Sequence, residues 1–437
     1  MAPGTGPGAG STTGTVAWRG LRALVPVERD ELAALLWSAA LFFTVLCSYY
    51  VIRPLRESLG LIGGVKNLPW MFTATFVAML LAVPLFSWVV ARWPRQVFIP
   101  LVYRAFAAML LGFFAALQLV SDESLVSVAR VFFVFAAVFA LFVVSVFWGY
   151  MADLWRREQG ERLFGFIAAG GTAGALAGPL LTGLLAPRIG NAYLLLVSML
   201  GLELAARCVG RLGRVAQPAA RAQACEGELP IAPGVFAGFT LTLSSPRLLW
   251  ICGYVLLLAI TGTFFYFEQM TIVGARIADP VARTVLFADI DLAVNLITFL
   301  LQSVVLGRLM PRIGLAWTLA ALPLVSLAGF LALGADPVFA VILGAQIVRR
   351  SADYAVSKPA REVLFTLVDR ESKYKAKNFI DTAVYRGGDA LGAWVFQGLQ
   401  GLGLGLSGLA LLAAPIAALW AGSSLLLGRL ARSAGRV

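Results

Sequence analysis

Long apolar stretches that recur along nearly the whole chain constrain its fold more than any other feature. Each has about 20 residues or more, enough for an α-helix that crosses about 30 Å of hydrocarbon. Hydrophobic residues make up 60% of the 437 residues and charged residues only 13%, with a mean hydropathy of +0.85. These values lie outside the range of soluble globular proteins. The sequence therefore predicts an integral membrane protein.

The stretches form two sets of six, so we expect twelve transmembrane helices. The first six cover residues 32–60, 68–91, 97–120, 125–152, 163–186 and 191–210. The second six cover residues 248–273, 281–309, 315–334, 337–356, 376–400 and 403–430. The expected fold class is an all-α membrane protein built from two pseudo-symmetric six-helix bundles. No room is left for a separate catalytic domain, so we do not expect an enzyme.

The domain boundaries follow from these spans. The predicted segments are a tail at 1–31, an N-terminal bundle at 32–210, a central loop at 211–246, a C-terminal bundle at 247–430 and a tail at 431–437. The first thirty residues are rich in Gly, Pro, Ser and Thr and lack the apolar core of a signal peptide. We therefore expect a disordered tail there.

Positive charge is distributed unevenly between the two ends of the predicted helices. The formal net charge is +12, and with the N-terminus inside most Lys and Arg residues fall on the cytoplasmic side. The residues near the other side are Arg53, Arg56, Lys66, Arg188, Arg276 and Arg283. This asymmetry follows the positive-inside rule. It predicts a multi-pass protein of a bacterial inner membrane with both termini cytoplasmic, and it explains the basic excess without nucleic acid.

A shared sequence offset indicates that the two halves are duplicates. Arg95, in a Pro-Arg turn after the second span, matches Arg312 in a Pro-Arg turn after the eighth, 217 residues later (312 − 95). The same offset (387 − 170) aligns the Gly-Gly pair at Gly170 with the pair at Gly387. Six plus six helices with basic turns at these positions resemble the major facilitator superfamily, whose two bundles rock around a midplane site.

Three glycines in the fifth span are spaced four residues apart, at Gly170, Gly174 and Gly178. This spacing places them on one face of a helix, where small residues let a neighbouring membrane helix approach closely. We expect a helix contact there rather than a ligand site.

Charged side chains at membrane depth are the main candidates for function, because each is costly unless it faces water or a partner. Histidine is absent, which removes imidazole as a proton carrier or metal ligand, and we expect no cofactor and no metal. Arginine binds phosphate or carboxylate through two parallel hydrogen bonds. The expected substrate-binding residues are Tyr49, Arg53, Arg56, Glu57, Asp381, Tyr385, Arg386 and Asp389. The expected gating or coupling residues are Asp153, Glu268, Asp289, Asp291, Arg349, Arg350 and Asp353.

Some of these charges are also consistent with structural ion pairs. Arg349 and Arg350 precede Asp353 by four and three residues, a spacing that favours a pair within one helix. Glu203 and Arg207 have the same spacing and the same interpretation. In that case these residues hold helices or gates together without binding substrate.

Neighbouring charges at other spacings are not expected to meet. Arg56 and Glu57 are adjacent, and adjacent helical residues point about 100° apart, so we predict no direct pair between them. Asp289 and Asp291 diverge for a similar reason, which argues against a metal-binding carboxylate pair. A pore-lining acid or a partner for arginine is the favoured interpretation of these two aspartates.

Three stretches resemble the ATP/ADP translocases (nucleotide transporters) of plastids and intracellular bacteria, which are grouped with the major facilitator superfamily. The stretches are Arg53-Pro-Leu-Arg-Glu-Ser-Leu, Phe147-Trp-Gly through Glu158 to Arg162-Leu-Phe, and Lys375-Ala-Lys-Asn-Phe-Ile-Asp381. The resemblance implies exchange of a nucleotide or a similar phosphorylated anion, with Arg56 in the place of a first-helix lysine that meets phosphate. Asp389 departs from the pattern, because the family has a functional lysine there, and Arg386 lies one turn earlier.

We therefore expect a monomeric secondary active transporter that works by alternating access and exchanges nucleotides or a related organic phosphate across the lipid bilayer. The alternative is a proton-coupled exporter of drugs or metabolites of the major facilitator type, in which Glu268, Asp289 or Asp291 takes up a proton. A membrane enzyme ranks third. No Walker A sequence is present, so ATP hydrolysis is not the expected driving force.

Overall fold

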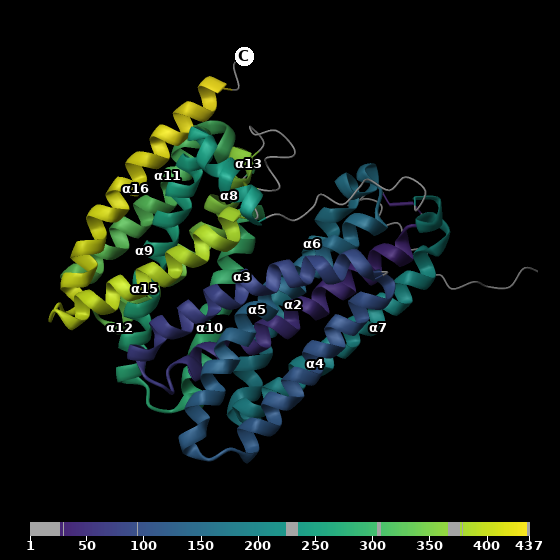
Figure 1. Cartoon of the computed structure of the whole chain (residues 1–437), viewed down its shortest axis with the longest axis horizontal. Coiled ribbons are helices and arrows are strands. Elements are labelled where there is room, and N and C mark those ends of the chain that lie inside the picture. The colour runs from purple at the N-terminus through teal and green to yellow at the C-terminus, as the bar shows by residue number, and fades with distance from the viewer. Residues whose placement is uncertain are drawn as a thin grey trace, which may run out of the picture.

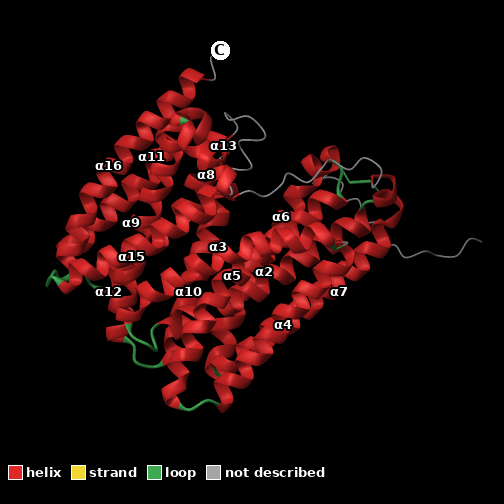
Figure 2. Ribbon diagram, in the orientation of Figure 1, coloured by secondary structure: helices red, strands yellow, loops and turns green. Residues whose placement is uncertain are grey.

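The computed structural model describes residues 27–434, apart from 29, 94, 224–234, 304–306, 366–375 and 378. All regular structure within these residues is helical, and Figure 2 shows the helices arranged as two lobes set at an angle to each other. The all-α fold class predicted from the sequence is confirmed.

The N-terminal lobe consists of six long helices and one short 3₁₀ turn. They are α2 (Leu32–Gly60), η1 (Val65–Asn67), α3 (Leu68–Arg92), α4 (Arg95–Leu119), α5 (Asp122–Leu154), α6 (Arg157–Ile189) and α7 (Asn191–Gln223). Each predicted span of this half lies in one helix, and most helix ends fall within a few residues of the predicted ends. The exception is α7, which continues into the segment expected to be the central loop.

The C-terminal lobe is less regular. Its elements are α8 (Val235–Ser244), α9 (Pro246–Arg276), α10 (Pro280–Leu301), α11 (Gly307–Ala335), α12 (Phe339–Ala352), η3 (Asp353–Ser357), α13 (Lys358–Phe365), η4 (Ile380–Val384), α15 (Tyr385–Gly401) and α16 (Leu406–Ala434). The chain turns within α11 at Gly314, whose φ of 76° is a conformation that favours glycine. The ninth crossing therefore begins after this residue, as the sequence predicts.

Two segments expected to be loops contain helix instead. The predicted central loop includes the last turns of α7 and all of α8, and the segment 357–375, which the predicted tenth and eleventh spans leave as a loop between them, includes α13. In these segments the polar residues that indicated a loop lie on helices that extend beyond the apolar stretches. The rest of the second segment, residues 366–375, falls outside the described residues.

Ten described helices are long and apolar enough to cross a membrane. The predicted tenth and eleventh spans are not among them, since the π-helical turns η3 and η4 divide each into shorter pieces. α12 runs directly into η3 and α13, and η4 runs directly into α15, so the helical path continues through both π-helical turns. Together with the ten, these two spans agree with twelve crossings.

Helix packing repeats between the lobes and so supports the predicted duplication. α2 packs against α6 and α7, as α9 packs against α15 and α16, and the pairing of α4 with α7 recurs as α11 with α16. Two helices make most of the contacts between the lobes: α3 of the N-terminal lobe packs against α15, and α10 of the C-terminal lobe packs against α6 and α2. Figure 1 shows α3 and α10 in the middle of the molecule, between the two lobes.

The three glycines of α6 bring this helix against α2. A Cβ atom at Gly178 would lie 2.6 Å from Cβ of Tyr50 and 2.8 Å from the carbonyl oxygen of Cys47. Gly170 and Gly174 likewise face the backbone of α2 too closely for any side chain. The helix contact predicted from their spacing is confirmed.

The lobes are joined at the end where α2 finishes and α10 begins. Ser58 Oγ donates a hydrogen bond of 2.7 Å to the carbonyl oxygen of Pro280, and Asn191 Nδ2 donates one of 3.1 Å to the same oxygen. Leu61 and Met71 from one lobe belong to the same buried apolar cluster as Phe287 from the other. This end of the molecule is closed by direct contact between the lobes.

Candidate functional site

A cavity of about 190 Å³ lies between the lobes, and we call it the central chamber. Its walls come from α2, α3, α5, α9, α10, α12, η3 and α15. The charged residues that line it are Arg53, Arg56, Glu57, Asp291, Arg349, Arg350, Asp353, Arg386 and Asp389. Most of the residues that the sequence singled out for binding or gating are thus brought to one place.

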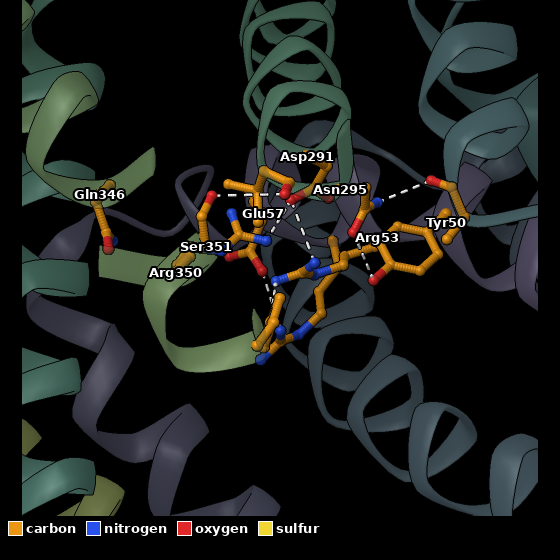
Figure 3. Close-up of polar contacts among 12 residues, drawn as sticks. Tyr50, Arg53, Glu57, Asp291, Asn295, Gln346, Arg350 and Ser351 are labelled. Atoms are coloured by element: carbon orange, nitrogen blue, oxygen red, sulfur yellow. Dashed lines mark hydrogen bonds and ion pairs between the residues drawn. The ribbon is translucent and has the colours of Figure 1, made fainter. Parts of the chain in front are cut away.

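Asp291 connects arginines from the two lobes. Its Oδ1 lies 3.2 Å from Arg53 Nη1 on α2 and 2.5 Å from Arg350 Nη2 on α12 (Figure 3). All three side chains are largely buried, with at most 14% of their area exposed. Arg53 Nη2 also donates to the hydroxyl of Tyr354, at 3.5 Å. Asp291 is therefore an arginine partner, as predicted, and Arg350 pairs with it rather than with Asp353.

Asn295, one turn after Asp291 on α10, adds a neutral link to the same interface. Its Nδ2 donates to the carbonyl oxygen of Ala175 on α6 at 2.8 Å, and its Oδ1 accepts from the hydroxyl of Tyr50 on α2 at 3.2 Å (Figure 3). α10 is thus fixed to the N-terminal lobe by one charged and one neutral residue on the same face.

Arg56 and Glu57 form a pair that the sequence analysis predicted not to form. Arg56 Nη1 lies 3.0 Å from Glu57 Oε1, and Glu57 Oε2 accepts a hydrogen bond of 2.5 Å from the hydroxyl of Tyr266 on α9. The prediction was wrong because it considered only the directions of the Cα–Cβ bonds, whereas the long arginine side chain reaches the carboxylate of its neighbour. The Cζ atom of Arg56 lies over the ring of Phe133, 3.9 Å from its centre.

Arg386 and Asp389 form the corresponding pair on α15. Arg386 Nη1 lies 3.2 Å from Asp389 Oδ2, and Thr263 Oγ1 on α9 donates to Asp389 Oδ1 at 3.3 Å. Each of the three arginines expected to bind substrate therefore contacts an acid. Arg386, the cation one turn before Asp389, lines the chamber.

Arg349 is the chamber cation with the fewest partners. It is 9% exposed, and its Nε has no hydrogen-bond partner among the described residues. No ion pair joins it to Asp353 in the part of the chain that the structure describes, so the pair expected from their spacing is not formed. Its guanidinium lies 5.5 Å from the ring centre of Phe265 and faces Gly262, where any side chain would touch it.

A second cavity of about 260 Å³ adjoins the central chamber. The two share Asp353, Tyr354, Tyr385 and Arg386 as lining residues. The other lining residues of the second cavity are Met79, Leu141, Lys358, Arg361, Asp381 and Thr382. Because α13 and η4 contribute to it, it lies on the side of the chamber away from the closed end at Ser58. Its lining includes the charged side chains of Lys358, Arg361 and Asp381.

Several predicted residues lie outside the central chamber. Asp381 lines the second cavity, whereas Asp153 and Asp289 are exposed and line neither cavity. Tyr49 packs against the rings of Tyr50 and Phe139 instead of facing the chamber. The divergence of Asp289 from buried Asp291 agrees with the prediction for residues two apart.

Glu268 has a different position, within the C-terminal lobe. Its side chain is fully buried, and neither carboxyl oxygen has a hydrogen-bond partner among the described residues. It does not line either cavity.

The sequence analysis missed one polar face of the chamber. Gly262, Tyr266 and Gln269 of α9 line it, and Gln269 Oε1 accepts a hydrogen bond of 2.7 Å from Gln346 Nε2 on α12. The signal was present, because these residues follow at i, i+4 and i+7 and so share a helix face. A charge-based search passes over neutral residues of this kind.

The charged residues that line the chamber do not balance. Five arginines and four carboxylates line it among the described residues, which leaves one positive charge in excess. The tyrosine hydroxyls and glutamine amides add neutral hydrogen-bond donors. The described residues contain no group of His, Cys, Asp or Glu side chains that could hold a metal ion.

Comparison with known proteins places the fold. No protein-family model and no curated protein sequence matches the chain. Among solved structures it is similar to the nucleoside transporter NupG, at 13% identity and a TM-score of 0.58, over 92% of this chain and 99% of that one. It is also similar to a bacterial homologue of the iron transporter ferroportin in an inward-facing state, at 15% identity and a TM-score of 0.62, over 92% of this chain and 98% of that one. An auto-inhibited POT family peptide transporter is similar at 15% identity and a TM-score of 0.61, over 92% of this chain and 97% of that one.

These similarities concern the fold, since the identities are far below those that indicate a shared function. They extend over 92% of this chain, so the likeness includes both lobes. The chain is therefore an all-α, multi-pass membrane protein, and its fold is similar to that of these solved transporters.

Proposed function

We propose that this protein is a secondary transporter that works by alternating access and carries an organic anion, specifically a nucleotide or a related organic phosphate. The observation that carries the proposal is that arginines from both lobes line one buried chamber between them. A ligand held by both lobes is sensitive to their relative movement, which is the requirement for alternating access.

The charge of the chamber supports an anionic substrate. One positive charge is in excess, and the Nε atoms of Arg56 and Arg349 are buried without hydrogen-bond partners in the described chain. A buried donor without a partner is costly, so a ligand that accepts from it recovers free energy on binding. Phosphate suits these donors, because its oxygens accept the paired N–H groups of guanidinium.

Aromatic residues support the nucleotide form of the proposal. Phe72, Tyr266 and Tyr385 line the chamber beside the arginines, where their rings offer apolar faces to a base. The resemblance of the segment from Arg53 to the nucleotide transporters points to the same class. The solved neighbour NupG is described as a nucleoside transporter, which makes nucleosides a natural comparison substrate.

Contacts between the lobes support exchange through one chamber. The closed end depends on Ser58 and Pro280, and the chamber itself is crossed by the ion pair between Arg53 and Asp291. An anion that binds Arg53 competes with Asp291 and weakens a contact that holds the lobes together. Substrate binding is thereby coupled to the movement that opens the other end.

We further propose that the protein lies in a bacterial inner membrane with both termini in the cytoplasm and works as a monomer. The distribution of Lys and Arg supports this orientation. A single chain also supplies every wall of the central chamber.

Counterflow in liposomes tests the function. The purified protein is reconstituted into liposomes loaded with ADP, and uptake of labelled ATP is measured with equal pH on both sides. We expect uptake that depends on internal ADP and falls at least about tenfold in R56Q, since a charge-assisted hydrogen bond contributes about 1.5–3 kcal/mol. K66Q is the control, because Lys66 is exposed and outside the chamber.

Two results would contradict the proposal. Unchanged counterflow in R56Q would remove Arg56 from the substrate site. Uptake of an uncharged or cationic solute that requires a proton gradient would replace the nucleotide proposal by proton-coupled transport. Buried Glu268 is the observation that favours this second candidate, because a carboxyl group without partners is neutral when it carries a proton.

A further inference from the structure

The outer surface of the N-terminal lobe carries charged residues where lipid is expected. Figure 1 shows α4 and α7 at the edge of this lobe, away from the C-terminal lobe. Glu203 on α7 lies 3.1 Å from both Arg104 Nε on α4 and Arg207 Nε on α7. The exposed fractions of the three side chains are 32%, 57% and 69%, respectively. We call this place the α4–α7 seam.

The seam lies within the membrane-spanning part of both helices. Arg104 is seven residues inside the apolar stretch that starts at Val97, and its partner Glu203 is seven residues before the end of the apolar stretch at 191–210. At 1.5 Å per residue both positions are about 10 Å from the ends of these stretches. Charged groups at such depth normally face the interior of a bundle, so their exposure requires a partner or access to the membrane surface.

The charges of the seam do not balance. Glu203 is the single acid that contacts Arg104 or Arg207 among the described residues, which leaves one positive charge in excess. Arg211 and Arg214 continue the same face of α7 at four and seven residues beyond Arg207, and both are exposed. The arginines thus form a path from the depth of the apolar stretch to its end, along which long side chains extend toward the headgroups.

Apolar side chains flank this path. Leu101 on α4 and Leu200 and Leu204 on α7 are between 49% and 59% exposed. They offer a surface for acyl chains next to the guanidinium groups.

We propose that the α4–α7 seam binds an anionic phospholipid, with the phosphate of the headgroup held by Arg207 and Arg211 and the acyl chains lying along Leu200 and Leu204. The positive excess selects a headgroup with net negative charge, such as phosphatidylglycerol, over a zwitterionic one. A lipid is the occupant favoured here because the seam joins charge and apolar surface along the direction of the bilayer normal.

Lipid-dependent thermal stability tests this proposal. The full-length protein in neutral detergent is titrated with phosphatidylglycerol or phosphatidylcholine, and its melting temperature is measured. We expect phosphatidylglycerol to raise the melting temperature several degrees more than phosphatidylcholine does, because a ligand of the native state stabilises it. The difference should disappear in R207Q/R211Q and persist in R207K/R211K and in R188Q, since Arg188 is exposed at the other end of the helices.

Native mass spectrometry of the same proteins provides the second measurement. Retained phosphatidylglycerol on the wild type and its loss from R207Q/R211Q would agree with the proposal. Equal stabilisation by both lipids, or an undiminished response of R207Q/R211Q, would overturn it. Conversion of a dimer to a monomer in R207Q/R211Q would also overturn it, because the seam would then be a protein interface. None of these measurements depends on transport.

Discussion

At the scale of single residues, Asp291 controls how many chamber arginines are free. Its carboxylate contacts Arg53 and Arg350, one from each lobe, and only 4% of its side-chain area is exposed. The anion proposed above and Asp291 are competitors for the same guanidinium groups. The affinity of the chamber for substrate therefore includes the cost of displacing this internal acid.

Replacement of Asp291 by asparagine tests this competition. D291N leaves the chamber with a larger positive excess and removes the competitor, so we expect ADP to bind about tenfold more tightly, which corresponds to about 1.4 kcal/mol. The loss of the link between lobes should also slow counterflow. Titration calorimetry with ADP measures the affinity, and D289N on the same helix is the control, because Asp289 is exposed and outside the chamber. Weaker binding by D291N would contradict the competition.

Replacement of Glu268 by glutamine separates the two candidate functions. Glu268 is fully buried and neither carboxyl oxygen has a hydrogen-bond partner among the described residues, and glutamine has nearly the same shape without the ability to ionise. For an exchanger we expect E268Q to retain ATP/ADP counterflow and a melting temperature equal to or above that of the wild type. Loss of transport with an intact fold would instead identify Glu268 as a proton carrier and favour the second candidate.

The sequence predicted which charges matter better than it predicted their partners. Arg53, Arg56 and Arg386 stand out because a charge inside an apolar stretch is costly, and all three reach the chamber. Spacing along one helix describes only neighbours on that helix, whereas Arg350 finds Asp291 on another helix. Tyr266 was missed, because a tyrosine in a membrane helix is ordinary until its hydroxyl is seen to bind Glu57.

At the scale of helical elements, the π-helical turns mark the boundary of the chamber. η3 carries Asp353 and Tyr354, and η4 immediately precedes Tyr385 and Arg386; these four residues line both cavities. Such turns are rare in proteins, and many of those that occur lie at functional sites. Pro359 accounts for η3, because a proline has no N–H to donate to the carbonyl group one turn before it. Hydropathy alone does not reveal these interruptions.

The contact between α2 and α6 gives a prediction about an element pair. Alanine at Gly178 would place a Cβ within 2.8 Å of two atoms of α2, including a backbone oxygen, so G178A should force the helices apart. We expect a loss of about 1–3 kcal/mol, measured as a lower melting temperature. The matched control is G165A on the same helix, where a Cβ meets nothing within 4 Å and helix propensity favours alanine. A melting temperature of G178A equal to that of the wild type would contradict the close contact.

At the scale of the whole molecule, the twelve crossings and the duplication were predictable, whereas the arrangement of the lobes was not. The apolar stretches and the shared offset between Gly170 and Gly387 are patterns that can be identified from the sequence alone. The closure of one end depends on contacts such as Ser58 with Pro280, which join residues far apart in the chain. No local pattern encodes them, because several arrangements of the same two bundles are compatible with the same hydropathy.

Alternating access requires the closed end to open in every cycle. Ser58 and Pro280 are in contact there, so cysteines at both positions can be joined by a short thiol-specific cross-linker. The variant S58C/P280C is made in a background without Cys47, Cys208, Cys225 and Cys252. We expect cross-linking to abolish ATP/ADP counterflow, because the joined lobes cannot separate at this end, and cleavage of a reducible linker to restore it.

Binding and transport should respond differently to this lock. The second cavity lies on the opposite side of the chamber, so the cross-linked protein should still bind ADP from that side. Each single-cysteine variant treated with the same reagent controls for simple modification of the thiol. Full counterflow in a protein shown by mass to be completely cross-linked would mean that the ends of α2 and α10 do not part during transport, and the rocking of two lobes around the central chamber would have to be abandoned.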